Sequence, residues 1–246
     1  MNPSDVLLRI PDALQQFLPP RRRGLPVTFV ADGDSTLGHI VESVGPPLPE
    51  VGGLLVDGRA VDAGHRPRGG ETVDVLPITR PQAVPDTDTP RFLLDVHLGA
   101  LARRMRLVGI DTAYHNDCDD PTLVVQANAE RRVLLTQDRG LLRRRNLWFG
   151  AYVYGIRADA QLDDLLRRFT LVLAPWTRCT ACNGELRSAT RDEVASDVEV
   201  GTLDAVTSFA RCRVCARVYW HGAHGGHLDE IVAAARRTVE GARAAG

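Results

Sequence analysis

The sequence contains no lysine: all 30 basic residues are arginines, set against 31 acidic residues. This absence excludes enzymes that form a Schiff base on lysine and nucleotide-binding proteins that need a P-loop lysine. The formal net charge of −1 points to no class of partner. A GC-rich genome is the ordinary explanation for all-arginine usage, although arginine is also the better bidentate ligand for phosphate.

The chain also lacks a long apolar segment. No run approaches the ~18 residues that a membrane-spanning helix needs. The opening residues MNPSDVLLRI have no basic segment leading into an apolar one, which a signal peptide would have. We therefore expect a soluble cytoplasmic protein with no membrane contact. In such a protein the five cysteines favour metal binding over disulfides.

Proline divides the chain. Four prolines stand at positions 77, 81, 85 and 90, a spacing that excludes helix or central strand there and is typical of a semi-rigid linker. The parts on either side differ in charge and in cysteine content. We expect a first domain, a linker, a second domain and a cysteine-containing region with a C-terminal helix, at residues 1–80, 81–90, 91–175 and 176–246.

The first domain has the order β-β-α-β-β-β. Short β-rich runs at 6–10, 26–30 and 72–78 predict strands, and a helix over 37–44 can be capped by Ser35 or Thr36. Asp57-Gly58 is a strong hairpin turn signal. The stretch from Leu54 to Ile78 resembles the ubiquitin-like β-grasp fold, in particular its sulfur-carrier branch. Sulfur carriers end in a free Gly-Gly, whereas Gly69-Gly70 is internal here, which argues against a carrier function.

The second domain alternates strands and helices. Apolar runs at 91–95, 131–138 and 147–156 predict strands, and amphipathic segments at 98–109, from Pro121 and at 161–169 predict helices. This alternation indicates a parallel sheet covered by helices on both faces. The fold class is therefore α/β.

Acidic residues follow the predicted strands. Asp95 and Asp138 end two of them, and Asp117, Asp119 and Asp120 lie in a loop that could reach the same sheet edge. Carboxylates gathered there would repel one another unless a cation joined them, and oxygen ligands suit Mg²⁺ or Mn²⁺. Such a cation can polarise a phosphoryl oxygen and activate water, which is the chemistry of phosphodiester hydrolysis.

Helix capping is the competing interpretation of these aspartates. Asp120 precedes Pro121 as a typical N-cap, and Asp138 could cap the helix after it. Asp119 we expect to be solvated, with Asp117 the better ligand. Asp95 is a poor direct cap, because two residues separate it from the next predicted helix.

The second domain resembles a known family in three motifs. They are Asp95 followed by Gly99–Arg103, the acidic loop Asn116–Asp120, and the Leu-Leu-Thr-x-Asp-Arg signature at Leu134–Arg139. Together they resemble the PIN-like RNase domain at the C-terminus of the Mut-seven exonuclease family, which in prokaryotes also follows a ubiquitin-like domain. Ala100 stands where the family more often has lysine. The resemblance implies a metal-dependent ribonuclease whose Mg²⁺ or Mn²⁺ ligands are Asp95, Asp117, Asp120 and Asp138; Asp159 is a further candidate.

Four cysteines form two Cys-x-x-Cys pairs, Cys179/Cys182 and Cys212/Cys215. Two such turns can present four thiolates tetrahedrally, which suits Zn²⁺, and a site closed by four cysteines is structural. A thioredoxin-like redox site would need only one pair. The family resemblance agrees, since its RNase domain carries a C-terminal zinc ribbon.

Arginine outnumbers acidic residues 14 to 10 between residues 91 and 178. Arginines beside an acidic pocket would let a phosphate backbone approach, although a solvated helix face explains any single one. An aromatic ring and a histidine after the ribbon could stack an RNA base, while packing of the ribbon explains the ring equally well. The candidate substrate-binding residues are Arg103, Arg139, Arg143, Arg144, Trp220 and His224. Histidines 221, 224 and 227 could also form a second metal site.

The leading hypothesis is a metal-dependent ribonuclease that acts on RNA, with structured RNA such as tRNA suggested by the added ribbon and domain. The alternative is an RNA-binding adaptor with an idle nuclease site. In both, the β-grasp domain offers a surface for a protein partner.

Overall fold

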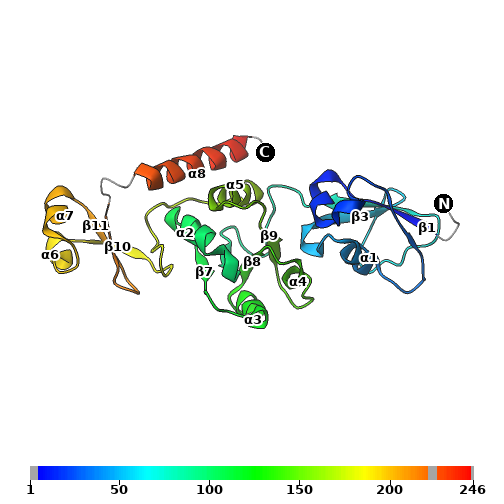
Figure 1. Ribbon diagram of the computed structural model, residues 1–246, viewed down its shortest axis with the longest axis horizontal. Helices are drawn as coiled ribbons and strands as arrows, with labels where there is room; N and C mark the ends of the chain where they lie inside the picture. Colours follow the sequence, from blue (N-terminus) through cyan, green and yellow to red (C-terminus); the bar gives the residue numbers. More distant parts are fainter. Residues whose placement is uncertain (1–4, 221–225, 245–246) are drawn as a thin grey trace. The chain divides into compact units, whose positions relative to one another are not determined.

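The computed structural model describes residues 5–220 and 226–244. It divides into two compact units (Figure 1). The first unit contains the residues up to Arg80 together with Thr136–Tyr152, and the second contains Pro81–Leu135 together with the residues from Val153 onward. A segment that begins within the Leu-Leu-Thr-x-Asp-Arg signature, at Thr136, thus packs with the N-terminal domain.

The first unit is built on a mixed five-stranded sheet of order β2-β1-β5-β3-β4. β1 runs parallel to β5, and the other pairs are antiparallel. Apolar side chains of α1 are buried as its 3.6-residue period requires. This confirms the predicted ubiquitin-like domain. Its elements are β1 (Asp5–Arg9), η1 (Asp12–Phe17), η2 (Pro20–Arg22), β2 (Val27–Val30), α1 (Leu37–Val44), η3 (Leu48–Glu50), β3 (Val51–Val56), β4 (Arg59–Val61) and β5 (Thr72–Pro77).

The structure contains the helix cap and the hairpin turn that the sequence of this domain predicts. The Thr36 hydroxyl caps α1 by accepting from the His39 amide at 3.4 Å. Asp57 and Gly58 have φ of 47° and 79°, which is the backbone that a tight hairpin turn between β3 and β4 requires. The first unit also includes α4 (Arg139–Leu142) and β9 (Gly150–Tyr152).

The second unit contains three parallel strands. β6 (Arg91–Leu94) pairs with β7 (Thr112–Tyr114) on one side and with β8 (Arg132–Thr136) on the other. β6 and β8 are almost entirely buried, as expected for a sheet covered on both faces. β7 was not among the predicted strands, because a three-residue strand leaves too short a pattern. The helices are η4 (Val96–Leu98), α2 (Gly99–Leu107), α3 (Asp120–Glu130) and α5 (Ala158–Arg168).

The proline-rich segment 81–90 contains only an isolated bridge between Val84 and Thr87. It is tied to the end of α5, since the Gln82 amide donates to the Arg168 carbonyl at 2.6 Å and Gln82 Oε1 accepts from Arg168 Nε at 2.7 Å. The segment is therefore packed on the second unit.

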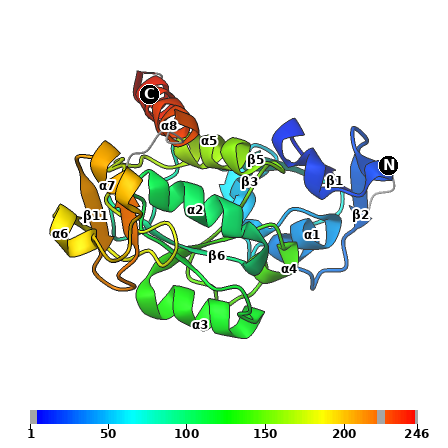
Figure 2. The same ribbon diagram turned by 60° about the vertical axis from the view of Figure 1, so that its left-hand side comes forward.

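The cysteine-containing region forms an antiparallel sheet of order β10-β11-β12. A small apolar cluster centred on Val194, Leu203 and Phe209 packs between this sheet and two short helices. The C-terminal helix α8 lies along α5 (Figures 1 and 2), where the Thr238 hydroxyl donates to Asp163 Oδ1 at 2.6 Å. The elements are β10 (Leu186–Ala189), α6 (Arg191–Val194), α7 (Val200–Ala205), β11 (Phe209–Cys212), β12 (Val218–Trp220) and α8 (Gly226–Ala244). Within the described part of the chain, none of the helices has the length and apolarity required to span a bilayer.

Candidate functional site

The carboxyl ends of the parallel strands meet at one edge of the sheet. Leu94, the last residue of β6, is in register with Tyr114 of β7 and Leu135 of β8. Asp95 comes directly after β6, its amide donates to the Leu135 carbonyl at 3.0 Å, and the residue is 7% exposed. Ligand sites of open α/β sheets lie at such an edge.

Asp95 is also a helix cap. Its Oδ1 accepts from the Val96 amide at 2.6 Å, and it is the N-cap of the 3₁₀ turn η4. Asp95 is not the N-cap of α2, which is Leu98, so it is a poor direct cap of that helix as expected, but it caps the turn before the helix. A 3₁₀ turn fills the two-residue gap before α2, and this turn left no periodic signal in the sequence.

The loop after β7 carries the other acidic residues of this unit. Asp117 is exposed. Asp119, rather than Asp120, is the N-cap of α3, because its Oδ1 accepts from the Thr122 amide at 3.0 Å. This hydrogen bonding lowers the pKa of Asp119. Asp120, which we expected to be the N-cap, is the first residue of the helix, so the cap lies one residue earlier than predicted.

Tyr114 explains the glycine of the first motif. Its hydroxyl donates to the Val96 carbonyl at 2.8 Å. A Cβ on Gly99 would lie 2.6 Å from this hydroxyl oxygen. Gly99 therefore allows Tyr114 to hold the turn that follows Asp95.

Asp138 belongs to the first unit and caps α4. Its Oδ1 accepts from the Gly140 amide at 2.6 Å, and its own amide donates to Thr136 Oγ1 at 2.8 Å. The capping interpretation of Asp138 is thus present in the structure. Metal binding by Asp138 stays a prediction.

The arginines predicted to bind RNA have different surroundings. Arg103 and Arg144 are exposed. Arg139 Nη1 donates to the Phe17 carbonyl at 2.7 Å, and Arg143 Nη2 donates to the carbonyls of Glu42 and Gly45. Both of these arginines are engaged by the ubiquitin-like domain.

Three further candidates remain. Asp159 forms an ion pair with Arg104, with an N–O distance of 2.8 Å. Trp220, at the end of β12, is 42% exposed. His224 lies outside the described residues, as does His221.

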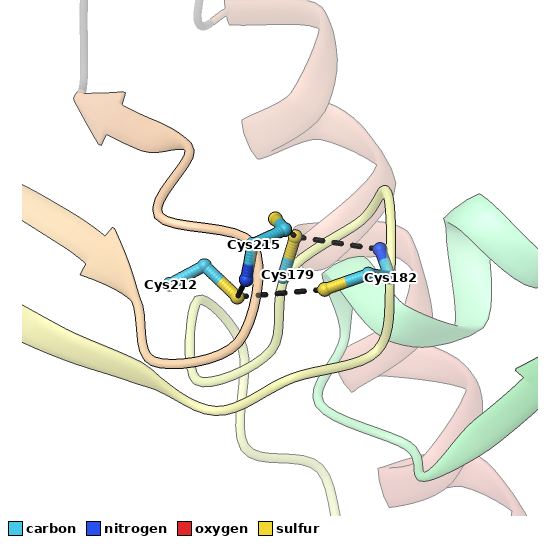
Figure 3. Close-up of side chains that lie close together, drawn as sticks. All are labelled: Cys179, Cys182, Cys212 and Cys215. Atoms are coloured by element: carbon cyan, nitrogen blue, oxygen red, sulfur yellow. Dashed lines mark hydrogen bonds between the residues drawn. The ribbon is translucent and has the colours of Figure 1, made fainter.

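The four paired cysteines come together. Their sulfur atoms all lie within 4.8 Å of one another, with Cys179 and Cys215 at 3.6 Å and Cys182 and Cys212 at 3.5 Å. Figure 3 shows the two turns converging. Asn183 and Ala216, each directly after a pair, have positive φ, so the two turns bend in the same way.

The pKa values of Cys179 and Cys182 in this cluster are shifted in opposite directions. Burial raises the pKa of Cys179, but hydrogen bonds from Tyr219 and from the Cys182 and Ala181 amides outweigh it, so the pKa is lowered to about 7. Burial, and then the neighbouring thiols, raise the pKa of Cys182 to about 12. Four sulfur ligands this close together could bind a structural metal ion, and such a set suits Zn²⁺.

Sequence analysis missed the residues that join this cluster to the sheet. Buried Arg106 donates to the Thr112 carbonyl at 2.8 Å and to the Thr180 and Ala181 carbonyls at 3.2 and 2.8 Å. Asn183 Oδ1 accepts from the Thr112 amide at 3.0 Å. The first cysteine turn is therefore bonded to the start of β7. No sequence pattern distinguished Arg106 from the other arginines of α2.

Asp111 extends this connection. It accepts from Arg132 at 2.6 Å and from Asn183 Nδ2 at 2.9 Å, and it lies 3.3 Å from an Arg178 nitrogen. Burial opposes its ionisation, but these hydrogen bonds and charges outweigh burial and lower its pKa.

Among the described residues, the cysteines are the one group of three or more candidate ligands whose atoms lie this close together. Asp95, Asp117 and Asp120, which share the second unit, do not form such a group. Their common feature is that they follow the ends of two paired strands: Asp95 follows β6, and the loop with Asp117 and Asp120 follows β7.

These features define a class of protein: a ubiquitin-like domain joined to a parallel α/β domain with acidic residues at its carboxyl edge and a four-cysteine ribbon. Comparison with family models gives the family. Residues 90–232 match the Mut7-C RNAse domain, and residues 4–83 match the Mut7-C ubiquitin domain. The chain therefore belongs to the Mut7-C RNAse domain family, which supports a nuclease function in general. No curated protein and no solved structure gave a significant match.

Proposed function

We propose that the protein is a metal-dependent ribonuclease with Asp95, Asp117, Asp120 and Asp138 as its Mg²⁺ or Mn²⁺ ligands. The observation that carries this proposal is the position of Asp95. This residue is buried at the strand edge, and its amide donates to the Leu135 carbonyl of the neighbouring strand. A buried carboxylate fixed at a sheet's carboxyl edge is suited to hold a hard cation.

The donor set fits such a cation, because carboxylate oxygens are the ligands that Mg²⁺ and Mn²⁺ prefer. A cation held there would supply Lewis-acid stabilisation of charge on the phosphoryl oxygens. The chain's own residues would orient the substrate. Exposed Arg103 and Arg144 would attract the phosphate backbone, and the Trp220 ring would offer a stacking face for a base.

Arg144 lies in a setting that suits a phosphate chain. With Arg145, His39 and Glu42 it lines a pocket of about 460 Å³ in the first unit. The arginines give the pocket wall positive charge close in sequence to Asp138. This supports RNA contact by the ubiquitin-like domain as well as by the nuclease domain.

The test is cleavage of end-labelled RNA by the purified full chain with Mg²⁺, Mn²⁺ or EDTA. Asp95→Asn should abolish cleavage and keep the fold, because asparagine caps a helix turn about as well as aspartate. Asp119→Asn is the matched control, since it removes one charge from the loop that carries Asp117 and Asp120 and keeps the cap of α3. Undiminished cleavage by Asp95→Asn would refute the assignment.

The substrate class is tested in the same assay. We propose structured RNA such as tRNA, and a folded tRNA and an unstructured RNA of equal length separate this from general RNA cleavage. The alternative function is an RNA-binding adaptor. The use of Asp95 and Asp138 as helix caps favours it, and RNA binding that survives EDTA without any cleavage would support it.

A further inference from the structure

The ubiquitin-like domain holds the segment that carries Asp138. Arg139 Nη1 donates to the Phe17 carbonyl at 2.7 Å. Arg143 Nη2 donates to the Glu42 carbonyl at 2.6 Å and to the Gly45 carbonyl at 2.7 Å. We call these three hydrogen bonds the α4 clamp.

The acceptors of the clamp lie at one place in the ubiquitin-like domain. Glu42 and Gly45 form the C-terminal end of α1, where main-chain carbonyls lack helical partners and the helix dipole is negative. A Cβ on Gly45 would lie 2.3 Å from the Phe17 carbonyl oxygen, so the acceptors of Arg139 and Arg143 are neighbours. A guanidinium is suited to bind such a group of carbonyls.

The far end of the same segment is also fixed. The Tyr152 amide donates to Oε1 of Glu50, a side chain with no exposed surface, at 2.8 Å. The Tyr152 and Phe17 rings meet edge to face, with 5.0 Å between their centroids. Phe17 therefore contacts this segment through both its carbonyl and its ring.

Asp138 stands at the start of the clamped helix. Arg139 follows Asp138 directly in the chain. Asp138 Oδ1 accepts from the Gly140 amide. The orientation of the Asp138 carboxylate thus depends on α4, and α4 depends on the clamp. Arg143, Arg144 and Arg145 all line the pocket described above. Arg143 nevertheless donates from its terminal nitrogen Nη2 to main-chain carbonyls of the protein.

We propose that the ubiquitin-like domain is a positioning element of the nuclease, with Arg143 as the residue that fixes the helix carrying Asp138. This rests on the proposed ribonuclease function and assigns the domain the role of holding Asp138, one of the proposed metal ligands. It also changes the expected role of Arg143 from binding substrate to positioning a metal ligand.

The test compares Arg143→Ala, Arg143→Lys and Arg59→Ala in the full chain. Arg59 is an exposed arginine of β4 in the same unit, so its variant controls for the loss of one positive charge. Hydrogen exchange of amides 136–145 reports the clamp directly. Cleavage is measured against both metal and RNA concentration.

For Arg143→Ala we expect exchange in 136–145 to rise about tenfold or more, as loss of charge-assisted hydrogen bonds implies. The metal concentration for half-maximal cleavage should rise about tenfold, with the KM for RNA unchanged and activity regained at saturating metal. Arg143→Lys should fall between wild type and Arg143→Ala. Arg59→Ala should match wild type in every readout.

Unchanged exchange in Arg143→Ala would overturn the proposal. So would a raised KM for RNA with an unchanged metal requirement, because that result would make Arg143 a substrate-binding residue. If the wild-type chain cleaves no RNA with any metal, the ribonuclease function fails. The exchange measurement then still decides whether the clamp exists.

Discussion

Replacing Arg106 with alanine should destabilise the second unit and weaken zinc binding at the same time. Arg106 is 3% exposed, and its side chain connects α2 to the Thr112 carbonyl of β7 and to the carbonyls of Thr180 and Ala181 in the first cysteine turn. Its positive charge lies close to Cys179 and Cys182. One side chain thus joins the sheet to the proposed zinc site.

The magnitude follows from these contacts. A hydrogen bond to a charged group contributes about 1.5–3 kcal/mol, and bonds that share one guanidinium do not add fully. We expect a loss of about 3–5 kcal/mol in the free energy of unfolding, comparable to breaking a buried charged interaction. At 2–4 °C per kcal/mol, the Tm should fall by roughly 6–20 °C.

Zinc affinity should fall as well, because four thiolates and Zn²⁺ carry a net charge of −2 that Arg106 partly offsets. Loss of an outer contact to a metal site typically weakens binding about 10–100-fold. Chelator competition and thermal melts of Arg106→Ala measure both effects, with exposed Arg103→Ala on the same helix as the control. A Tm and a zinc affinity equal to those of the control would refute the reasoning.

Two other predictions concern the same unit. Gly109→Ala should fail to fold stably, because Gly109 has φ of 88° and a Cβ there would lie 2.0 Å from the Ala174 carbonyl oxygen; a soluble variant with wild-type Tm would contradict this. Asp111 has a pKa lowered from its ordinary value of 3.8, so its ionised form stabilises the fold above that pH, and the stabilisation is lost as pH falls through the lowered pKa. Denaturant unfolding should therefore show Asp111→Asn less stable than wild type at pH 7, with the difference shrinking below pH 3.8.

The sequence predicts elements best where local chemistry decides the structure. The hairpin at Asp57-Gly58 and the cap at Thr36 depend on residues within a few positions, and both are present. The two cysteine pairs are equally local, and their turns bring the sulfur atoms together. Fold class followed from the order of such elements, because strands that alternate with helices form parallel sheets.

The site was less predictable because its details depend on packing between distant segments. Asp95 caps a 3₁₀ turn that has no periodic pattern, and β7 exists because its three residues pair with β6. Arg103 and Arg106 look alike in sequence, yet Arg103 is exposed while Arg106 is buried against the cysteine turn. Residue type could not reveal which arginine had a buried partner.

The same distinction limits what a count of positive charge says about RNA binding. Arg106, Arg139 and Arg143 all direct their guanidinium groups at main-chain carbonyls of the protein. Carbonyls do not neutralise these charges, so the three arginines still make the local electrostatic potential more positive. Arg106 and Arg143 donate to these carbonyls with their terminal nitrogens, so we expect direct contact with phosphate from other arginines, and Arg103 and Arg144 are exposed. In a chain without lysine, arginine is the residue available both for crosslinking the fold and for the proposed contacts with RNA, and the surroundings of each side chain separate these two roles.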